Sequence, residues 1–162
     1  MKKCLLIATI LLCTLFVTSN AIIADTAVDG GKTVVPPSER AIAQDLAADG
    51  PTETLGIEAS TVLGSMSLAG EFAGTEGHML RVREVTVLPG GQVAVHQHTS
   101  RPGAAYVLEG ELVEHRNDVD GPLVRHVGDV ALEKTGTIHW WKNESSEKAK
   151  VLVVDIVPNE AK

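Results

Sequence analysis

Three histidines have a spacing that could form a metal site. His96 and His98 are two residues apart in the strand-like segment 92–98, and His139 lies in a later strand-like segment, 137–141. Because side chains alternate between the two faces of a strand, the His96 and His98 imidazoles are expected to point the same way. A barrel could bring His139 beside them. Three neutral imidazoles suit Fe, Mn, Ni, Cu or Zn and leave positions open for water or a substrate.

This spacing alone does not separate a metal site from ordinary histidines, and the other candidate side chains give weaker indications. Trp140 and Trp141 alternate faces, so one of them is expected to line a pocket beside His139. Glu109 and Glu111 could act as acid or base, although glutamates in turns are usually solvated. No phosphate loop, nucleophile-elbow serine or dinucleotide fingerprint is present. The remaining histidines are expected to be ordinary polar residues: His78, His115 and His126.

The elements that must position these side chains are strands. From about residue 60 the chain consists of runs rich in Val, Leu and Ile, bounded by Gly, Pro and Asn-Asp. Eight short strands with turns at this spacing indicate a closed barrel or a sandwich. No helical periodicity of comparable strength follows residue 55. The predicted strands are 60–68, 79–88, 91–98, 104–116, 122–127, 129–133, 137–142 and 148–157.

The glycines around the three histidines resemble the two sequence motifs of the cupin superfamily. The first runs Gly90, five residues, His96-Gln97-His98, four residues, Gly103, six residues, Gly110. The second runs Gly128, five residues, Lys134-Thr135-Gly136, two residues, His139, three residues, Asn143. The resemblance covers roughly residues 60–158. It implies a small single-domain, type-2-like cupin, an all-β fold with one jelly-roll barrel built as a double-stranded β-helix.

The resemblance also implies a site. His96, His98 and His139 correspond to the three metal-binding histidines of the family, and they would hold one divalent transition metal. Three further residues are expected to line the pocket or contact a substrate: Arg101, Tyr106 and Trp141.

The sequence departs from the family pattern at two positions. Gly103 stands where the family usually has its metal-binding Glu, and Lys134 replaces the usual turn Pro. Without that glutamate, three neutral ligands leave a divalent cation with its full charge. The site should therefore favour anionic guests, and Arg101 could assist as a fork-shaped partner for a carboxylate.

Three classes of function remain open. The first is a metal-dependent, dioxygenase-like enzyme that acts on a small anionic or enolisable molecule bound at the open metal positions. The second is a non-catalytic barrel that binds a small molecule or a metal, and the third keeps the barrel only as a scaffold. The three-histidine spacing favours the first two over the third and does not separate them. A homodimer is expected, as is common in the family.

The first 24 residues have the pattern of a signal peptide. Lys2 and Lys3 precede an apolar run over 4–17, and small residues offer cleavage before Ile22 or after Ala24. This run is shorter than the about 20 residues that span a bilayer, although an uncleaved anchor is an alternative. Both cysteines lie within it, so the mature chain would contain no disulfide and no thiolate. A periplasmic or secreted location is expected, with no stable membrane insertion after cleavage.

Composition and the positions of Gly and Pro bear on the possible partners and on the N-terminal segment. The 162 residues include 14 Lys or Arg and 21 Asp or Glu, and the net charge of −7 leaves no basic stripe for nucleic acid. Residues 25–58 are interrupted by Gly and Pro pairs and are expected to be a flexible segment with a short helix from Ser38 to Gly50. Residues 59–162 would then be the barrel domain.

Overall fold

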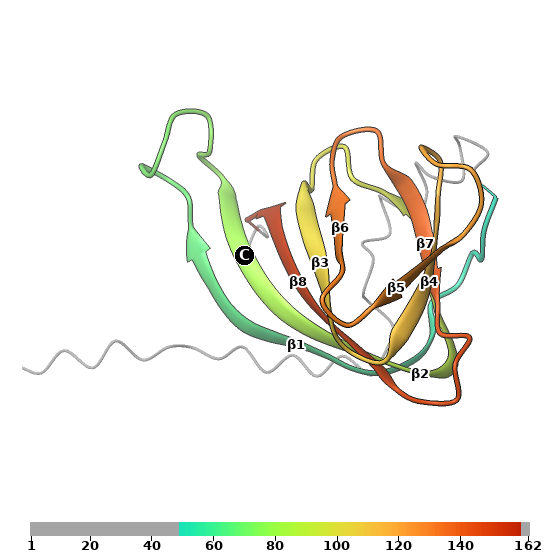
Figure 1. The fold of residues 1–162 in the computed structure, drawn as a ribbon. Coiled ribbons are helices and arrows are strands. Elements are labelled where there is room, and N and C mark those ends of the chain that lie inside the picture. Colours follow the sequence, from blue (N-terminus) through green and yellow to red (C-terminus); the bar gives the residue numbers. More distant parts are fainter. Residues whose placement is uncertain (1–48, 160–162) are drawn as a thin grey trace, which may run out of the picture.

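The computed structural model describes residues 49–159, which form eight strands and no helix (Figure 1). Within these residues no helix is long and apolar enough to cross a membrane. The predicted signal peptide, most of the 25–58 segment and its short helix lie outside the described residues. The strands are β1 (Leu55–Ser67), β2 (His78–Gln97), β3 (Gly103–Glu109), β4 (Glu111–Arg116), β5 (Leu123–His126), β6 (Val130–Glu133), β7 (Ile138–Lys142) and β8 (Ala149–Pro158).

All eight strands belong to one antiparallel sheet that curls into a nearly closed barrel. The strand order is β5-β4-β7-β2-β8-β3-β6, and β1 pairs with β2 outside this path. The strand path ends at β5 and β6. Across the gap between these two ends, Arg116 of β4 donates a hydrogen bond of 3.1 Å to the Leu132 carbonyl of β6. The predicted all-β barrel is confirmed.

The strands differ from the prediction in three places: β1 begins at Leu55 instead of residue 60, within the segment predicted to be flexible, and two other differences occur at glycines. The predicted strands 79–88 and 91–98 form one 20-residue strand, β2, which bends at Gly90 with φ 74°. Before the bend β2 pairs with β1 and β8, and after it β2 pairs with β7 and, at Gln92, still with Leu55 of β1. The predicted strand 104–116 instead divides at Gly110, with φ 69°, where a Cβ would lie 2.5 Å from the Lys148 carbonyl oxygen. Glycine adopts this conformation without a steric penalty.

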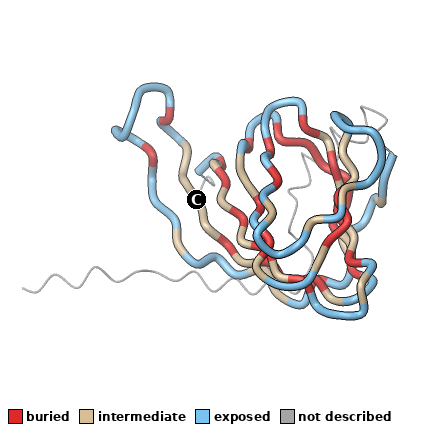
Figure 2. Tube along the Cα trace, viewed as in Figure 1, coloured by how far each residue is buried: buried red, intermediate tan, exposed pale blue. Residues whose placement is uncertain are grey.

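The barrel interior has an apolar end and a charged end. Strand β8 shows both, because every second residue from Ala149 is buried: three apolar residues come first and Asp155 follows. Figure 2 shows this alternation of buried and less buried residues along the barrel strands. The apolar cluster contains Val85, Val87, Val93, Ala105, Val107, Leu112, Trp141, Val151 and Val153.

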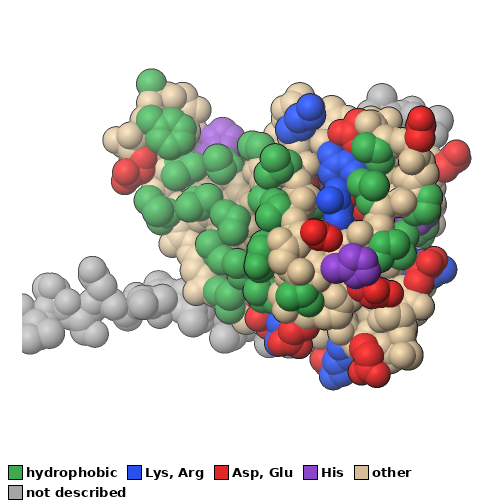
Figure 3. All heavy atoms as spheres, in the orientation of Figure 1, with side chains coloured by type: hydrophobic (Ala, Val, Ile, Leu, Met, Phe, Trp, Pro, Cys, Tyr) green, Lys and Arg blue, Asp and Glu red, His purple; other side chains and the backbone are tan. Residues whose placement is uncertain are grey.

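Residues 60–77, here called the arm, comprise the outer part of β1 and the turn that leads into β2. Four large apolar side chains of the arm are 45–58% exposed: Val62, Leu63, Met66 and Phe72. Figure 3 shows hydrophobic side chains gathered on the arm and on the neighbouring barrel strands. Within the described residues β1 pairs only with β2, so β1 is an edge strand.

Candidate metal centre

Two neighbouring strands place the three histidines together. Val93 pairs with Trp141, and a regular register would then set Val95 opposite His139. A register shift on β2 instead sets His96 directly opposite His139. Directly paired residues project from the same face of a sheet. His98 follows just beyond the end of β2, and its backbone nitrogen donates a hydrogen bond to the Thr137 carbonyl that precedes β7.

The imidazole nitrogens converge. The Nε2 atom of His139 lies 2.9 Å from Nε2 of His98 and 3.0 Å from Nε2 of His96. The three side chains offer ligand atoms that all lie within 4.8 Å of one another. All three residues are buried, with at most 4% of their surface exposed.

The opposite ring nitrogens fix the tautomers. Nδ1 of His96 lies 2.8 Å from the Ala94 carbonyl oxygen, Nδ1 of His98 lies 2.8 Å from the Arg101 carbonyl oxygen, and Nδ1 of His139 lies 2.7 Å from a Glu114 oxygen. These oxygens can only accept, so each Nδ1 carries a proton and donates it. In a neutral ring Nε2 then presents a lone pair. Three lone pairs therefore point at one small volume.

Burial keeps the three rings neutral. It lowers the pKa of His96 and of His139 well below the ordinary value, and the neighbouring imidazoles add to the effect. Burial and the positive charge of Arg101 lower the pKa of His98 to about 4. At neutral pH the lone pairs are therefore available to a cation.

A buried carboxylate orients His139. Glu114, fully buried on β4, accepts hydrogen bonds from His139 and from Arg116 at 2.7 and 2.8 Å through Oε1. Its other oxygen accepts one from Arg125 at 2.9 Å. Histidine ligands of metals commonly donate their second nitrogen to such a carboxylate, which fixes the ring and raises its basicity. Glu114 is therefore a positioning residue of this centre.

A small cavity of about 40 Å³ lies beside His96. Its walls combine apolar core residues with Arg83, Arg101, Glu133 and Trp141. A cavity of this size holds a few water molecules or a guest of a few atoms.

Charged groups surround the polar end of the cavity. The buried Asp155 carboxylate accepts from Arg81 at 3.0 and 2.8 Å and from Arg101 at 3.2 Å, and Arg83 approaches to 3.7 Å. Burial would raise the pKa of Asp155, but the hydrogen bond from Arg81 and the three positive charges hold it below the ordinary value. Burial lowers the pKa of Arg83 to about 10.

Glu133 adds a second carboxylate to this wall. Burial raises the pKa of Glu133 to about 7, against the opposing effect of Arg101 and Arg83. Although Gly103 occupies the position of the family glutamate, β6 brings another carboxylate, Glu133, within 3.7 Å of His139. With Glu133 ionised, three arginines face two carboxylates, and one positive charge is left over.

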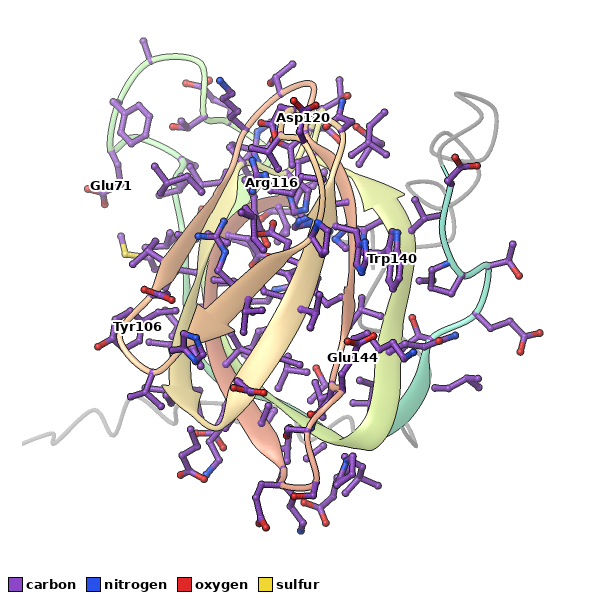
Figure 4. The ribbon with its side chains drawn as sticks, turned by 45° about the vertical axis from the view of Figure 1, so that its right-hand side comes forward. Glu71, Tyr106, Arg116, Asp120, Trp140 and Glu144 are labelled. Carbon is purple, nitrogen blue, oxygen red and sulfur yellow. The ribbon has the colours of Figure 1, made fainter. Side chains whose placement is uncertain are left out.

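Two of the three residues predicted to line the pocket do so in the structure. Arg101, 2% exposed, and Trp141, 6% exposed, line the cavity. Tyr106 does not: it is 40% exposed and points away from the barrel, as Figure 4 shows. The reason is strand alternation, since its neighbours on β3, Ala105 and Val107, face inward.

The weaker candidates are not part of the three-histidine cluster. Glu109 and Glu111 have side chains 63% and 45% exposed. His126 has a side chain 65% exposed. His115 stacks on Trp140 with ring centroids 3.7 Å apart, and His78 is half-buried near the Glu76 carbonyl oxygen.

Sequence reasoning missed four residues of the centre, which share one signal. Each is a charged residue two positions from a buried apolar residue of the same strand, as Glu133 is two residues after the buried Ala131. The four are Arg83, Glu114, Glu133 and Asp155.

Comparison with known proteins identifies the family of this domain. Residues 83–155 match the family described as "Cupin domain". The chain contains a cupin domain. The match begins within β2 and ends within β8, so this cupin domain includes all three histidines. No curated protein matches the chain.

Solved structures with similar folds include proteins of different kinds. TT1209 from Thermus thermophilus is 30% identical over 49% of this chain and 72% of its own, with TM-score 0.43. A cupin-superfamily sugar phosphate isomerase from Silicibacter pomeroyi is 23% identical over 63% and 65%, with TM-score 0.46. The cupin domain of Schizosaccharomyces pombe Cnp3 is 13% identical over 62% and 63%, with TM-score 0.46. The chain thus spans less than two thirds of the length of the last two.

Proposed function

We propose that this cupin domain binds one divalent transition metal through His96, His98 and His139 and presents it to a small anionic molecule. The observation that carries the proposal is the convergence of three buried imidazoles, with Nε2 of His139 lying 2.9 Å from Nε2 of His98 and 3.0 Å from Nε2 of His96. Lone pairs at this separation repel one another unless a cation lies between them. Fe, Mn, Ni, Cu and Zn all accept such a donor set.

The donor set fits a metal in a second way. Two ligand atoms bonded at about 2.1 Å and at right angles to one another lie about 3.0 Å apart. The Nε2 separations agree with that value. The Nδ1 partners fix the three rings in place, so the site is organised before any metal binds.

The surrounding charges favour an anionic guest. A bound metal supplies a Lewis acid that polarises an oxygen of the guest. Arg83 and Arg101 of the chain line the cavity and can orient a carboxylate or enolate by charge-assisted hydrogen bonds. The apolar wall, with Trp141, excludes bulk water from the other side of the guest. The cavity volume of about 40 Å³ favours a molecule of a few heavy atoms.

Two outcomes are chemically consistent with this site. The guest is either turned over, as in a metal-dependent, dioxygenase-like enzyme, or bound reversibly and released unchanged. In both cases the charged residues that line the cavity, Arg83, Arg101 and Glu133, favour binding of an anionic molecule. Turnover is the first choice because three protein ligands leave open metal positions at which a substrate can react.

The test is metal content by mass spectrometry of protein purified without chelators and without a histidine-rich tag, beside a His96→Ala/His98→Ala variant. We expect near-stoichiometric transition metal in the wild type and none in the variant. A matched control, His78→Ala/His126→Ala, should keep its metal. Absence of metal from the wild type after reconstitution would refute the proposal. Oxygen consumption with small enolic carboxylates, beside recovery of the unchanged compound, then separates the enzyme from the binding protein.

We also propose that the protein is exported and forms a homodimer. Export rests on the signal-like sequence over 1–24, and N-terminal sequencing of the mature protein tests it. The homodimer is supported by the exposed apolar side chains of the arm and by its open strand edge.

A further inference from the structure

A row of paired residues crosses the barrel wall at the level of the histidines. Arg81 of β2 pairs with Asp155 of β8, Asp155 pairs with Gly103 of β3, and Gly103 pairs with Glu133 of β6. Directly paired residues project from the same face of a sheet. Asp155 and Glu133 therefore enter the interior on either side of Gly103, and both side chains are buried.

Gly103 has no room for a side chain. A Cβ at this position would lie 2.7 Å from the Val154 carbonyl oxygen and 3.0 Å from Cβ of Asp155. The first contact is with backbone, which cannot move aside cheaply. In this barrel β3 therefore cannot supply a carboxylate at position 103, and the nearest inward-facing residue of the next strand is its pairing partner, Glu133.

The Glu133 carboxylate lies against the three-histidine centre. Its Oε1 is 3.7 Å from Nε2 of His139, and its Oε2 is 3.6 Å from Nδ1 of His98. Glu133 is only 5% exposed, and within residues 49–159 its Oε2 atom has no hydrogen-bond partner.

The other buried carboxylates of the interior differ in this respect. Both oxygens of Glu114 accept hydrogen bonds from side chains, and both oxygens of Asp155 accept from arginines. A buried acceptor without a partner costs about 1–3 kcal/mol. The Glu133 carboxylate therefore keeps unused acceptor capacity at Oε2, while its Oε1 is the oxygen that lies near Nε2 of His139. A carboxylate in this state beside the three imidazoles is suited to bind a cation.

We propose that Glu133 is the anionic ligand of the metal centre, supplied by β6 in place of the carboxylate that Gly103 cannot carry. This inference rests on the proposed three-histidine metal site. Ligand atoms of one metal lie about 3.0–3.5 Å apart, so the 3.7 Å separation from His139 closes with a small rotation of the glutamate side chain. With the Glu133 carboxylate bound, the net charge of the metal and its ligands falls from +2 to +1.

Titration of metal-free protein with Co(II) tests this ligand, because the visible absorption of Co(II) reports its donor set and competition with a chelator gives its Kd. We expect Glu133→Gln to weaken Co(II) binding at least tenfold and to change the Co(II) spectrum. The matched control is Glu109→Gln, an exposed glutamate on the adjacent strand, which should bind Co(II) as the wild type does. Circular dichroism establishes that each variant is folded.

Each other outcome counts against the proposal in a distinguishable way. If His96→Ala abolishes Co(II) binding while Glu133→Gln leaves Kd and spectrum unchanged, the metal site stands and Glu133 is not its ligand. A weaker Kd with an unchanged spectrum would also overturn the ligand role, because it indicates an effect of charge alone. If the wild type binds no Co(II), the three-histidine site and this inference fail together. Should Glu133→Gln not fold, Glu133→Asp keeps the charge, shortens the side chain by one methylene, and should likewise change the spectrum.

Discussion

The barrel interior buries charged side chains, whereas the arm exposes large apolar ones. At one end of the interior, Asp155 and Glu133 are buried with their arginine neighbours. On the arm, Leu63 and Phe72 are 57% and 58% exposed. Burying charge and exposing apolar surface both cost stability relative to the usual distribution. Each is expected where a protein binds something, which is consistent with the proposed anionic guest in the barrel and the proposed second copy on the arm.

The largest effect is expected from Asp155→Asn. This change removes the charge that Arg81, Arg83 and Arg101 share, and leaves them close together in the interior. Removing one partner of a buried ionic cluster costs about 3–5 kcal/mol. The measurement is the free energy of unfolding in urea, with the exposed Asp120→Asn as control, expected within about 0.5 kcal/mol of wild type. Equal effects of the two changes would mean that the cluster does not stabilise the barrel.

Two leucines allow the barrel core and the arm to be compared with the same residue type. Leu112 is 1% exposed in the barrel core, and Leu63 is 57% exposed on the arm. Leu112→Ala leaves a cavity and should cost about 2–5 kcal/mol. Leu63→Ala should cost less than about 0.5 kcal/mol in the monomer. Thermal unfolding at low protein concentration checks both, and a large loss in Leu63→Ala would show that the arm packs against the barrel.

Acid should destabilise the metal-free protein through the histidines. The pKa of His98 is lowered to about 4, so between about pH 6.5 and 4 the unfolded state takes up a proton that the folded state does not. This contribution to the free energy of unfolding is therefore fully present above pH 6.5 and is lost as the pH falls, by an amount on the order of 3 kcal/mol for this residue. His96 and His139 act in the same direction.

Glu133 opposes this trend, because its pKa is raised to about 7 and stability falls as the pH rises from about 4.5 to 7. Glu133→Gln should therefore make the acid loss steeper. The measurement is urea unfolding in EDTA at several pH values. A flat profile in the variant would contradict the neutral, buried state of the three imidazoles.

The sequence predicted the parts of this centre that local pattern specifies. His96 and His98 are two apart on one strand, and the motif glycines place His139 on another. Glu114 and Glu133 were not predictable in this way, because their roles depend on which strands pair and in which register. Tyr106 was misplaced although Ala105 and Val107 carry an alternation that sets it outward. The merging of two predicted strands into β2 depends on a glycine bend that continues the sheet instead of ending it.

The smallest effect on stability, and the sharpest on association, is expected from Leu63→Asp on the arm. The side chain is already exposed, so the free energy of unfolding of the monomer should change by less than about 0.5 kcal/mol. If a second copy covers the arm, the aspartate introduces a charge into an apolar interface, and the dimer expected for the wild type should dissociate. Light scattering after size-exclusion chromatography measures this, with Val127→Asp, at a 61% exposed apolar position between β5 and β6, as the control. A dimer that persists in Leu63→Asp but dissociates in Val127→Asp would move the interface from the arm to the barrel, and the apolar surface of the arm would then have to serve a different partner.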